Sequence, residues 1–391
     1  MAEEQSTTPV VILGVGLSAL GTARSLGRAG LRPYLVAPRG DLATRTRWVR
    51  GRVLHFGETA DPDALDAQLK QRGLGRVVLV PCTDEWLEVV ASLALSAPET
   101  YLASVPDPGV VDMLVDKLRF AEKVKLLGVA HPLTVPVTSE ADLDGRDLTG
   151  WFLKPRKSQL FARRYHRKAF TLDSPDAARD AYRTLAGAGL EGVLQEYIPG
   201  LSSDHYFIDG FVDRESQVRT MFARRRVRMF PLDYGNSTLM ASVPLTEVQQ
   251  AAGDLSRFLT EIGYRGVFSA EFKKDQRDGV LRVLEVNARA WWYVGFAADC
   301  GVDVSLMAYR DAVGADVPES TGYAVGVRCV LLPQDVRAFH ALRKAGKISW
   351  RAWVASWLGA RPAVFAWNDP MPAISLPLFV ARRAIRLATA S

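Results

Sequence analysis

Hydrophobic and polar positions along the first part of the chain follow an alternation of strands and helices. Residues 9–13 form a β-branched apolar run, and a glycine turn then leads into helical spacing of apolar residues over 17–28. Further apolar runs occupy 34–37 and 76–81. Short buried strands separated by amphipathic helices are typical of a parallel α/β sheet. We therefore expect a Rossmann-like N-terminal domain over residues 1–112.

The periodicity changes in the middle of the chain. An amphipathic helix begins after Asp116 and ends at Gly128, and a strand over 192–196 leads into a proline-glycine turn. Helices and strands of this kind predict two α+β subdomains, followed by a largely helical C-terminal region. The three predicted parts are residues 113–190, 191–318 and 319–391. The predicted fold class is therefore a multidomain combination of α/β and α+β structure.

A hairpin near residue 280 carries the most informative polar pattern. Alternate positions on one face of its two strands are polar, namely Ser269, Glu271 and Lys273, then Glu285, Asn287 and Arg289. With a loop over 276–280, Glu271 lies directly opposite Glu285, and two carboxylates so placed repel unless a cation neutralises them. Because Mg²⁺ accepts carboxylate and amide oxygens, we interpret Glu271, Glu285 and Asn287 as a metal site, with Mn²⁺ as an alternative ion. The competing interpretation is a hairpin that faces solvent.

Composition and charge exclude several classes of protein. The chain has 391 residues, 48% of them hydrophobic, which is enough for several packed layers. Its net charge is +6, but no zinc-finger or RNA-binding signature accompanies the charge, so we expect no nucleic-acid partner. The three cysteines lack metal-type spacing, and the N-terminus lacks the basic region of a signal peptide. Both features favour a cytoplasmic protein.

Two strand ends in the N-terminal domain are candidate ligand sites. Gly14-x-Gly16 follows the first strand and is either a phosphate-binding turn for NAD(P) or a structural turn. The next glycine comes too late for the dinucleotide fingerprint, and no acidic residue follows the second strand at the required place, so we favour the structural turn. Thr83, Asp84 and Glu85 follow a later strand and are either substrate-pocket residues or a helix N-cap.

Basic side chains within strands are further candidates. Lys154 lies inside a short apolar strand, where a lysine taken alone is read as a side chain that extends its ammonium to water. Arg224, Arg226 and Arg228 alternate on one face of a later strand. Because guanidinium groups match phosphate and carboxylate oxygens, this face is either an anion site or a solvated sheet edge.

Taken together, these segments resemble the ATP-grasp superfamily of carboxylate–amine ligases over roughly residues 1–315. The resemblance rests on "DKLRF", a strand lysine in "FLKP", the hinge strand "LQEYIPG", and "AEF" followed by "LEVNAR". Within the superfamily the chain is similar to a branch that includes D-aspartate ligase and carbamoyl-phosphate-synthase-like proteins. One departure is that the stretch "RKSQLFARRYHRK" stands where many members carry a glycine-rich lid. Phosphate contacts from that stretch would come from Ser158, Arg163 or Lys168.

The resemblance assigns a role to each matching position. The residues it implies for ATP are Lys117 and Lys154 at the phosphates, Gln195, Glu196, Tyr197 and Ile198 at the adenine, and Asp204 or His205 at the ribose. The implied metal ligands are Glu271, Glu285 and Asn287. Arg289 would steady the transferred phosphoryl group or the substrate carboxylate. Arg226 would face the same cleft, so the implied catalytic residues are Arg289, Arg226 and Lys154.

The chemistry that follows is ATP-dependent joining of a carboxylate to an amine. Transfer of the γ-phosphoryl group of ATP makes an acyl phosphate, which an amine attacks to give an amide, ADP and phosphate. We expect small-molecule substrates, an amino acid or peptide-like carboxylate and an amine. A lone His166 or His205 is either a base in this reaction or a structural residue. The alternatives are a non-catalytic nucleotide sensor or scaffold with the same fold, and an NAD(P)-dependent oxidoreductase.

The C-terminal region is rich in tryptophan and ends in a basic apolar segment over residues 376–391. We expect this segment to pack on its own domain or on a second subunit, which would form a homodimer. Peripheral contact with an anionic membrane and binding of another partner are the alternatives.

Overall fold

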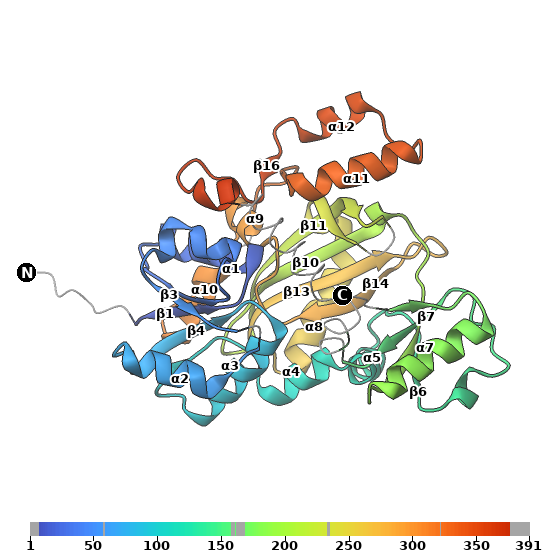
Figure 1. Ribbon diagram of the computed structural model, residues 1–391, viewed down its shortest axis with the longest axis horizontal. Helices are drawn as coiled ribbons and strands as arrows, with labels where there is room; N and C mark the ends of the chain where they lie inside the picture. Colours follow the sequence, from blue (N-terminus) through green and yellow to red (C-terminus); the bar gives the residue numbers. More distant parts are fainter. Residues whose placement is uncertain are drawn as a thin grey trace, which may run out of the picture.

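Three β-sheets organise the protein, and helices pack on them (Figure 1). The computed structural model describes residues 8–57, 59–157, 161, 169–232, 235–320 and 322–375. One sheet is parallel and the other two are largely or wholly antiparallel. The predicted combination of α/β and α+β structure is therefore confirmed.

The apolar runs of the N-terminal part form a five-stranded parallel sheet in the order β3-β2-β1-β4-β5. Its strands are β1 (Val10–Leu13), β2 (Tyr34–Ala37), β3 (Val53–His55), β4 (Val77–Pro81) and β5 (Tyr101–Leu102). Its helices are α1 (Gly16–Arg28), α2 (Pro62–Gln71) and α3 (Asp84–Ser96). Val10 and Ile12 pack with α1, whereas Val11 and Leu13 pack with α2 and α3. Burial on both faces explains why these strands are apolar throughout.

A four-stranded antiparallel sheet forms the small central subdomain in the order β6-β9-β7-β8. Its strands are β6 (Thr134–Val137), β7 (Trp151–Pro155), β8 (Phe170–Thr171) and β9 (Gly192–Glu196). Helix α7 (Pro175–Gly187) covers it, and α4 (Pro108–Val115) and α5 (Lys117–Leu126) lead into it from the N-terminal sheet. The boundaries that we placed after residues 112 and 190 lie inside α4 and before β9, so β9 completes the small sheet.

The large sheet has seven strands in the order β14-β13-β10-β11-β12-β15-β16. Its strands are β10 (His205–Val212), β11 (Val218–Phe230), β12 (Asn236–Ser242), β13 (Gly266–Lys274), β14 (Leu281–Asn287), β15 (Arg328–Val330) and β16 (Arg361–Pro362). Ile208 and Phe268 pack with α8 (Gln249–Glu261) on one face. Phe207 and Met240 face the N-terminal sheet, α9 (Val294–Asp299) and α10 (Val304–Ala312). The large sheet therefore lies between α8 and the N-terminal domain.

The C-terminal part packs on the large sheet rather than apart from it. Strands β15 and β16 extend that sheet, and α11 (Leu332–Lys344) and α12 (Trp350–Trp357) lie beyond β11 (Figure 1). Buried Asp335 of α11 accepts hydrogen bonds from Trp353, Trp357 and Arg228, each at 2.8 to 2.9 Å. These tryptophans are thus structural. The basic segment 376–391 lies outside the described residues, and among those described no helix is long and apolar enough to cross a membrane.

Candidate active site

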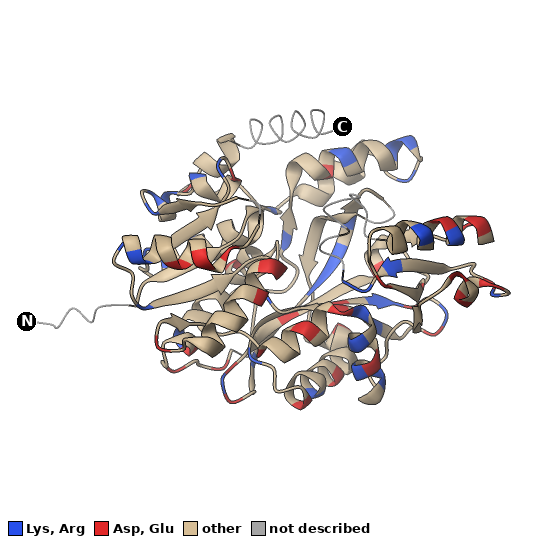
Figure 2. Cartoon of the chain, turned by 60° about the horizontal axis from the view of Figure 1, so that its bottom comes forward, with Lys and Arg blue, Asp and Glu red and all other residues tan. Residues whose placement is uncertain are grey.

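Polar side chains of the large sheet gather where β14, β13, β10 and β11 run side by side. Strand register places Glu271 of β13 opposite Glu285 of β14, as the alternation predicted. The hairpin loop is one residue shorter than expected, because Asp275 pairs with Val280, and a shift in the ladder after Glu271 restores the predicted register. Figure 2 shows basic and acidic positions beside one another on these central strands.

The Glu271 carboxylate contacts His205 of the adjacent strand β10 and Arg226 of β11, the next strand along. Nδ1 of His205 lies 2.7 Å from Glu271 Oε1, and Nη2 of Arg226 donates to the same oxygen at 3.1 Å. Burial lowers the pKa of His205, and the hydrogen bond to Glu271 opposes this effect. Burial likewise lowers the pKa of Arg226. Glu271 is therefore fixed in place by hydrogen bonds from side chains of two other strands.

The other two predicted metal ligands lie together on β14. Asn287 Nδ2 donates to Glu285 Oε1 at 3.2 Å, and the Glu285 side chain is exposed to solvent. Two carboxylates on adjacent strands with an amide oxygen beside them are a donor set that fits Mg²⁺. No cluster of three or more His, Cys, Asp or Glu side chains suited to a metal occurs within the described part of the chain. A magnesium ion at Glu271, Glu285 and Asn287 would therefore depend on water and substrate oxygens for its remaining ligands.

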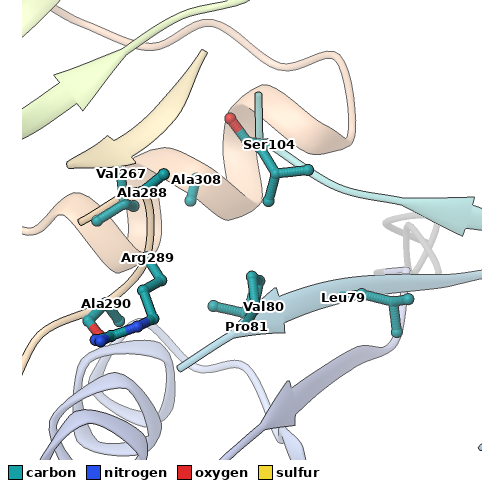
Figure 3. A pocket seen from close by; sticks show the side chains of 10 residues that line it. Leu79, Val80, Pro81, Ser104, Val267, Ala288, Arg289, Ala290 and Ala308 are labelled. Carbon is teal, nitrogen blue, oxygen red and sulfur yellow. The ribbon is translucent and has the colours of Figure 1, made fainter. Parts of the chain in front are cut away.

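Arg289 joins this site to the N-terminal domain. Its Nε and Nη2 donate to the two carboxylate oxygens of Asp84 at 2.5 and 3.0 Å, and Nη2 also lies 3.5 Å from Asn287 Oδ1. The attraction of Asp84 outweighs burial and raises the pKa of Arg289. Figure 3 shows Arg289 between the end of β14 and the end of β4, beside a cavity of about 10 Å³, room for one water. Of the predicted pocket residues, Thr83 is the N-cap of α3, whereas Asp84 contacts Arg289.

The predicted ATP-phosphate lysine and the predicted adenine residues meet in the small sheet. Lys154 on β7 donates from Nζ to Gln195 Oε1 on β9 at 2.6 Å. Glu196 accepts a hydrogen bond from the backbone of Leu133 at 3.1 Å and forms an ion pair with Arg277 at 2.6 Å. The Arg277 contact ties the hinge strand to the hairpin turn of the large sheet.

Beyond β9 the chain lines the space between the small and large sheets. Ile198 is buried, whereas 37% of the Tyr197 surface is exposed. Lys273 of β13 is buried with its ammonium 4.4 Å from the Tyr197 ring centre, and burial lowers its pKa. Lys273 shares a strand face with Glu271, and this alternation is the sequence signal that could have identified it as a site residue. Asp204 accepts hydrogen bonds from the Leu201 backbone and from Gln276, at 2.7 and 3.0 Å.

Lys117 begins α5, and its backbone amide donates to the carbonyl of Arg156 at 3.0 Å, just after β7. Asp116, the N-cap of α5, pairs with the Arg156 guanidinium at 2.6 Å. This contact brings Lys117 close to the end of the strand that carries Lys154. The candidate lid residues Ser158, Arg163 and Lys168, and His166 with them, lie outside the described residues.

The arginine face of β11 is divided among three carboxylates of the chain itself. Buried Arg224 pairs with Asp209 at 2.5 Å, Arg226 with Glu271, and Arg228 with Asp335. The predicted face is present, but it is neither a solvated edge nor a row of three guanidinium groups turned toward one ligand. Of the three, Arg226 is the one that contacts a predicted metal ligand.

The glycine turn after β1 is occupied by the chain itself. The amide of Gly16, which begins α1, donates to both carboxylate oxygens of Asp41 at 3.0 and 3.1 Å. A carboxylate at this helix N-terminus takes the place that a phosphate would need in a dinucleotide fold. A Cβ on Gly21 would lie 2.8 Å from the backbone nitrogen of Gly295, so this glycine lets α1 pack against α9. Gly16 and Gly21 are therefore both explained by the fold, without a bound nucleotide.

Comparison with known proteins agrees with this arrangement. D-aspartate ligase from Enterococcus faecium (strain Aus0004) is 24% identical over 323 residues, covering 78% of this chain and 76% of that protein. The biotin carboxylase domain of Hydrogenobacter thermophilus 2-oxoglutarate carboxylase, a dimer in complex with MgADP, ADP and bicarbonate, matches with a TM-score of 0.65 and 16% identity over 82% of this chain and 73% of that one. L-amino acid ligase from Bacillus licheniformis matches with a TM-score of 0.60 and 13% identity, over 78% and 74%. No family model matches the chain.

The chain has the fold of the ATP-grasp ligases, which its motifs resemble. The proteins that it is similar to include two ligases, D-aspartate ligase and L-amino acid ligase. The predicted class of protein is thereby confirmed.

Proposed function

We propose that this protein is an ATP-dependent ligase that joins a carboxylate to an amine through an acyl phosphate. The observation that carries the proposal is the placement of Glu271 opposite Glu285, with Asn287 and Arg289 continuing the same strand face. Two opposed carboxylates beside an amide and a guanidinium suit a magnesium-bound triphosphate better than a solvent-facing hairpin. The likeness to D-aspartate ligase and L-amino acid ligase supports an amide-forming reaction.

Each group has a defined task in this reaction. Mg²⁺ at Glu271, Glu285 and Asn287 supplies charge neutralisation for the phosphates of ATP. His205 and Arg226 hold Glu271 in place, so the ligand does not need to reorient when ATP binds. Lys154 and Lys117 contact phosphate oxygens, and Gln195, Glu196, Tyr197 and Ile198 enclose the adenine, with Asp204 at the ribose. Arg289 neutralises the carboxylate oxygens during phosphoryl transfer, and the amine then displaces phosphate.

The surrounding parts of the chain have proposed roles as well. The N-terminal parallel sheet is a Rossmann-like domain whose strand ends face the small-molecule carboxylate and amine. A homodimer in the cytoplasm is the proposed form of the enzyme, and the dimeric biotin carboxylase domain supports it. No observation on the described residues favours membrane contact, and we do not propose it.

The test is release of ADP and phosphate from ATP and Mg²⁺ in the presence of carboxylates paired with amines. The panel pairs D- and L-amino acids, and simple carboxylic acids, with amino acids, dipeptides and ammonia as amines. ADP release that requires both partners and yields an amide by mass spectrometry would support the proposal. Glu285→Gln is the matched inactive variant, because its side chain is exposed and the substitution preserves its shape. ATP binding without turnover on any pair would favour a sensor.

A further inference from the structure

The ion pair between Asp84 and Arg289 lies where a substrate carboxylate would bind. Arg289 follows β14 and its metal ligands, and Asp84 is the first residue of α3 in the N-terminal domain. The Asp84 carboxylate accepts two hydrogen bonds in parallel from the Arg289 guanidinium, at 2.5 and 3.0 Å. This bidentate geometry is the one in which a guanidinium binds any free carboxylate. The protein therefore holds one of its own carboxylates on the arginine proposed to bind the substrate.

Exposure of the two side chains makes exchange feasible. Arg289 is 19% exposed and Asp84 is 33% exposed, so water reaches both partners. Water and salt can therefore compete with the ion pair at its solvated side. A substrate carboxylate that brings an equivalent pair of oxygens can replace Asp84 on Arg289 without leaving the guanidinium uncompensated.

The exchange leaves Asp84 without its cation. Arg289 is the ion-pair partner of Asp84 in the part of the chain that the structure describes. The displaced carboxylate remains at the N-terminus of α3, beside the bound substrate, and an unpaired carboxylate in a partly buried place is unfavourable. A ligand that carries an ammonium group next to its carboxylate removes this cost, because the ammonium replaces Arg289 as the partner of Asp84.

We propose that Asp84 and Arg289 form the recognition site for a zwitterionic amino acid, with the substrate carboxylate on Arg289 and its ammonium on Asp84. The inference rests on the proposed ligase function and deepens it by naming Asp84 as the residue that selects an amino acid over a plain carboxylic acid. Asp84 is a specificity residue and takes no part in phosphoryl transfer. In the free enzyme Asp84 keeps Arg289 oriented, and in the complex Asp84 binds the ammonium group of the substrate.

Selectivity for the amino group follows from the same exchange. A carboxylic acid without an amino group must displace Asp84 and leave it unpaired, whereas an amino-acid amide brings no carboxylate for Arg289. Loss of one partner of a charged hydrogen bond weakens binding by about tenfold or more. We therefore expect the protein to bind at least one amino acid about tenfold or more tightly than the same acid without its amino group.

The experiment compares wild type, Asp84→Asn and a matched control, Asp299→Asn. Asp299 of α9 pairs with Arg28 of α1 at 2.9 Å, so this pair also joins the N-terminal domain to a later part of the chain, away from the metal strand. D- and L-alanine and aspartate, with propionate and succinate as counterparts, are titrated with MgADP present. The readout is intrinsic fluorescence, since Trp291 and Trp292 follow Arg289 in the chain. Asp84→Ser is a second variant in case the amide disturbs α3.

The expected result is a change in the ratio of affinities. In Asp84→Asn the preferred amino acid binds about tenfold more weakly, while its counterpart without the amino group binds as well as before or more tightly. Asp299→Asn keeps the wild-type ratio. Three results would overturn the inference. They are equal weakening of the binding of both ligands, an unchanged ratio of affinities in both Asp84 variants, and no preference for the amino acid in the wild type.

Failure of this inference is distinct from failure of the proposed function, because the ratio is measured without turnover. If the preference for an amino acid depends on Asp84 but the protein releases no ADP, the recognition site is supported and the ligase function is rejected. If ADP release requires a carboxylate but the ratio of affinities is the same in the wild type and the Asp84 variants, the ligase function is supported and the recognition site is rejected.

Discussion

Glu271 and Glu285 face each other across β13 and β14 at the point where the ladder between these strands shifts register. Glu271 is compensated by His205 and Arg226, whereas Glu285 is exposed and has Asn287 beside it. Two carboxylates in directly opposite positions destabilise a sheet in the absence of a cation. Arg226 supplies part of this compensation at Glu271, and a metal ion bound between the two carboxylates would supply the rest.

The first prediction concerns Glu285→Gln. Removing one of the two like charges should stabilise the metal-free protein by about 0.2–1 kcal/mol. The same change should abolish the additional stabilisation that Mg²⁺ and ATP give the wild type, because ligands that bind the native state raise its melting temperature. Thermal unfolding with and without MgATP checks both parts. A variant that is stabilised by MgATP as strongly as the wild type would contradict the assignment of Glu285 as a metal ligand.

The second prediction concerns Lys154, which donates to Gln195 at 2.6 Å. If its ammonium contacts ATP phosphates, Lys154→Ala should lower kcat/KM for ATP by about 100-fold, the loss typical of one preorganised donor to a reacting phosphoryl or oxyanion. Lys70→Ala is the matched control, because Lys70 also makes a 2.6 Å contact but lies exposed on α2. Steady-state ADP release at varied ATP concentration measures both. Equal kinetics in the two variants would assign Lys154 a structural role.

Local pattern was sufficient for the polar face of the hairpin. Alternation within the chain placed Glu271 opposite Glu285, and it also placed Arg224, Arg226 and Arg228 on one face of β11. The position of the register shift was not predictable, because it depends on how the large sheet twists against its neighbours. The predicted loop over 276–280 was one residue too long, and the register shift compensates for this error, so the predicted pairing of Glu271 with Glu285 was still correct.

Partners from distant segments were beyond the reach of the sequence. Asp84 and Arg289 are 205 positions apart, and Arg228 and Asp335 are 107 positions apart. Their contacts depend on how the sheets pack together, and periodicity within a segment carries no information about that packing. For this reason the arginine face of β11 was predicted, while its three separate carboxylate partners were not.

The third prediction concerns Gly21, where a Cβ would lie 2.8 Å from both the Gly295 nitrogen and a Val294 methyl group. Gly21→Ala should force α1 away from α9 and destabilise the protein by about 1–3 kcal/mol. Gly253→Ala is the matched control, because Gly253 lies in α8 with open space around it and alanine favours a helix by about 1 kcal/mol. Chemical denaturation measures both. Similar midpoints for the two variants would show that the α1–α9 contact tolerates a methyl group.

The fourth prediction concerns Asp335, which is fully buried and accepts hydrogen bonds from Arg228, Thr238, Trp353 and Trp357. Asp335→Asn leaves a buried guanidinium without a counterion and should destabilise the protein by about 3–5 kcal/mol. Adding Arg228→Met should recover part of this loss, because the uncompensated charge is then removed. The double-mutant cycle compares the melting temperatures of the wild type, Asp335→Asn, Arg228→Met and the double variant. Strictly additive losses would mean that the two residues are not coupled.

The last prediction concerns acid stability and rests on Asp275, whose side chain is buried in the hairpin turn. Hydrogen bonds from Arg277 lower the pKa of Asp275 to about 2, and Arg282 adds to this effect. Because the pKa is lower in the folded protein than in the unfolded chain, the pair stabilises the fold above about pH 4 and loses its effect as the pH falls toward 2. The contribution is at most about 2 kcal/mol, since Arg277 is half exposed and solvent screens it.

Denaturant midpoints of wild type and Asp275→Asn at pH 7, 4 and 3 test this expectation. The wild type should be the more stable protein at pH 7. The stability difference should narrow between pH 4 and pH 3, because Asp275 then binds a proton in the unfolded chain while it stays ionised in the folded protein. Asp278→Asn is the control, since Asp278 pairs with Arg282 at 2.6 Å but is largely solvated. A gap that stays constant with pH would mean that Asp275 stabilises the turn through its shape rather than its charge.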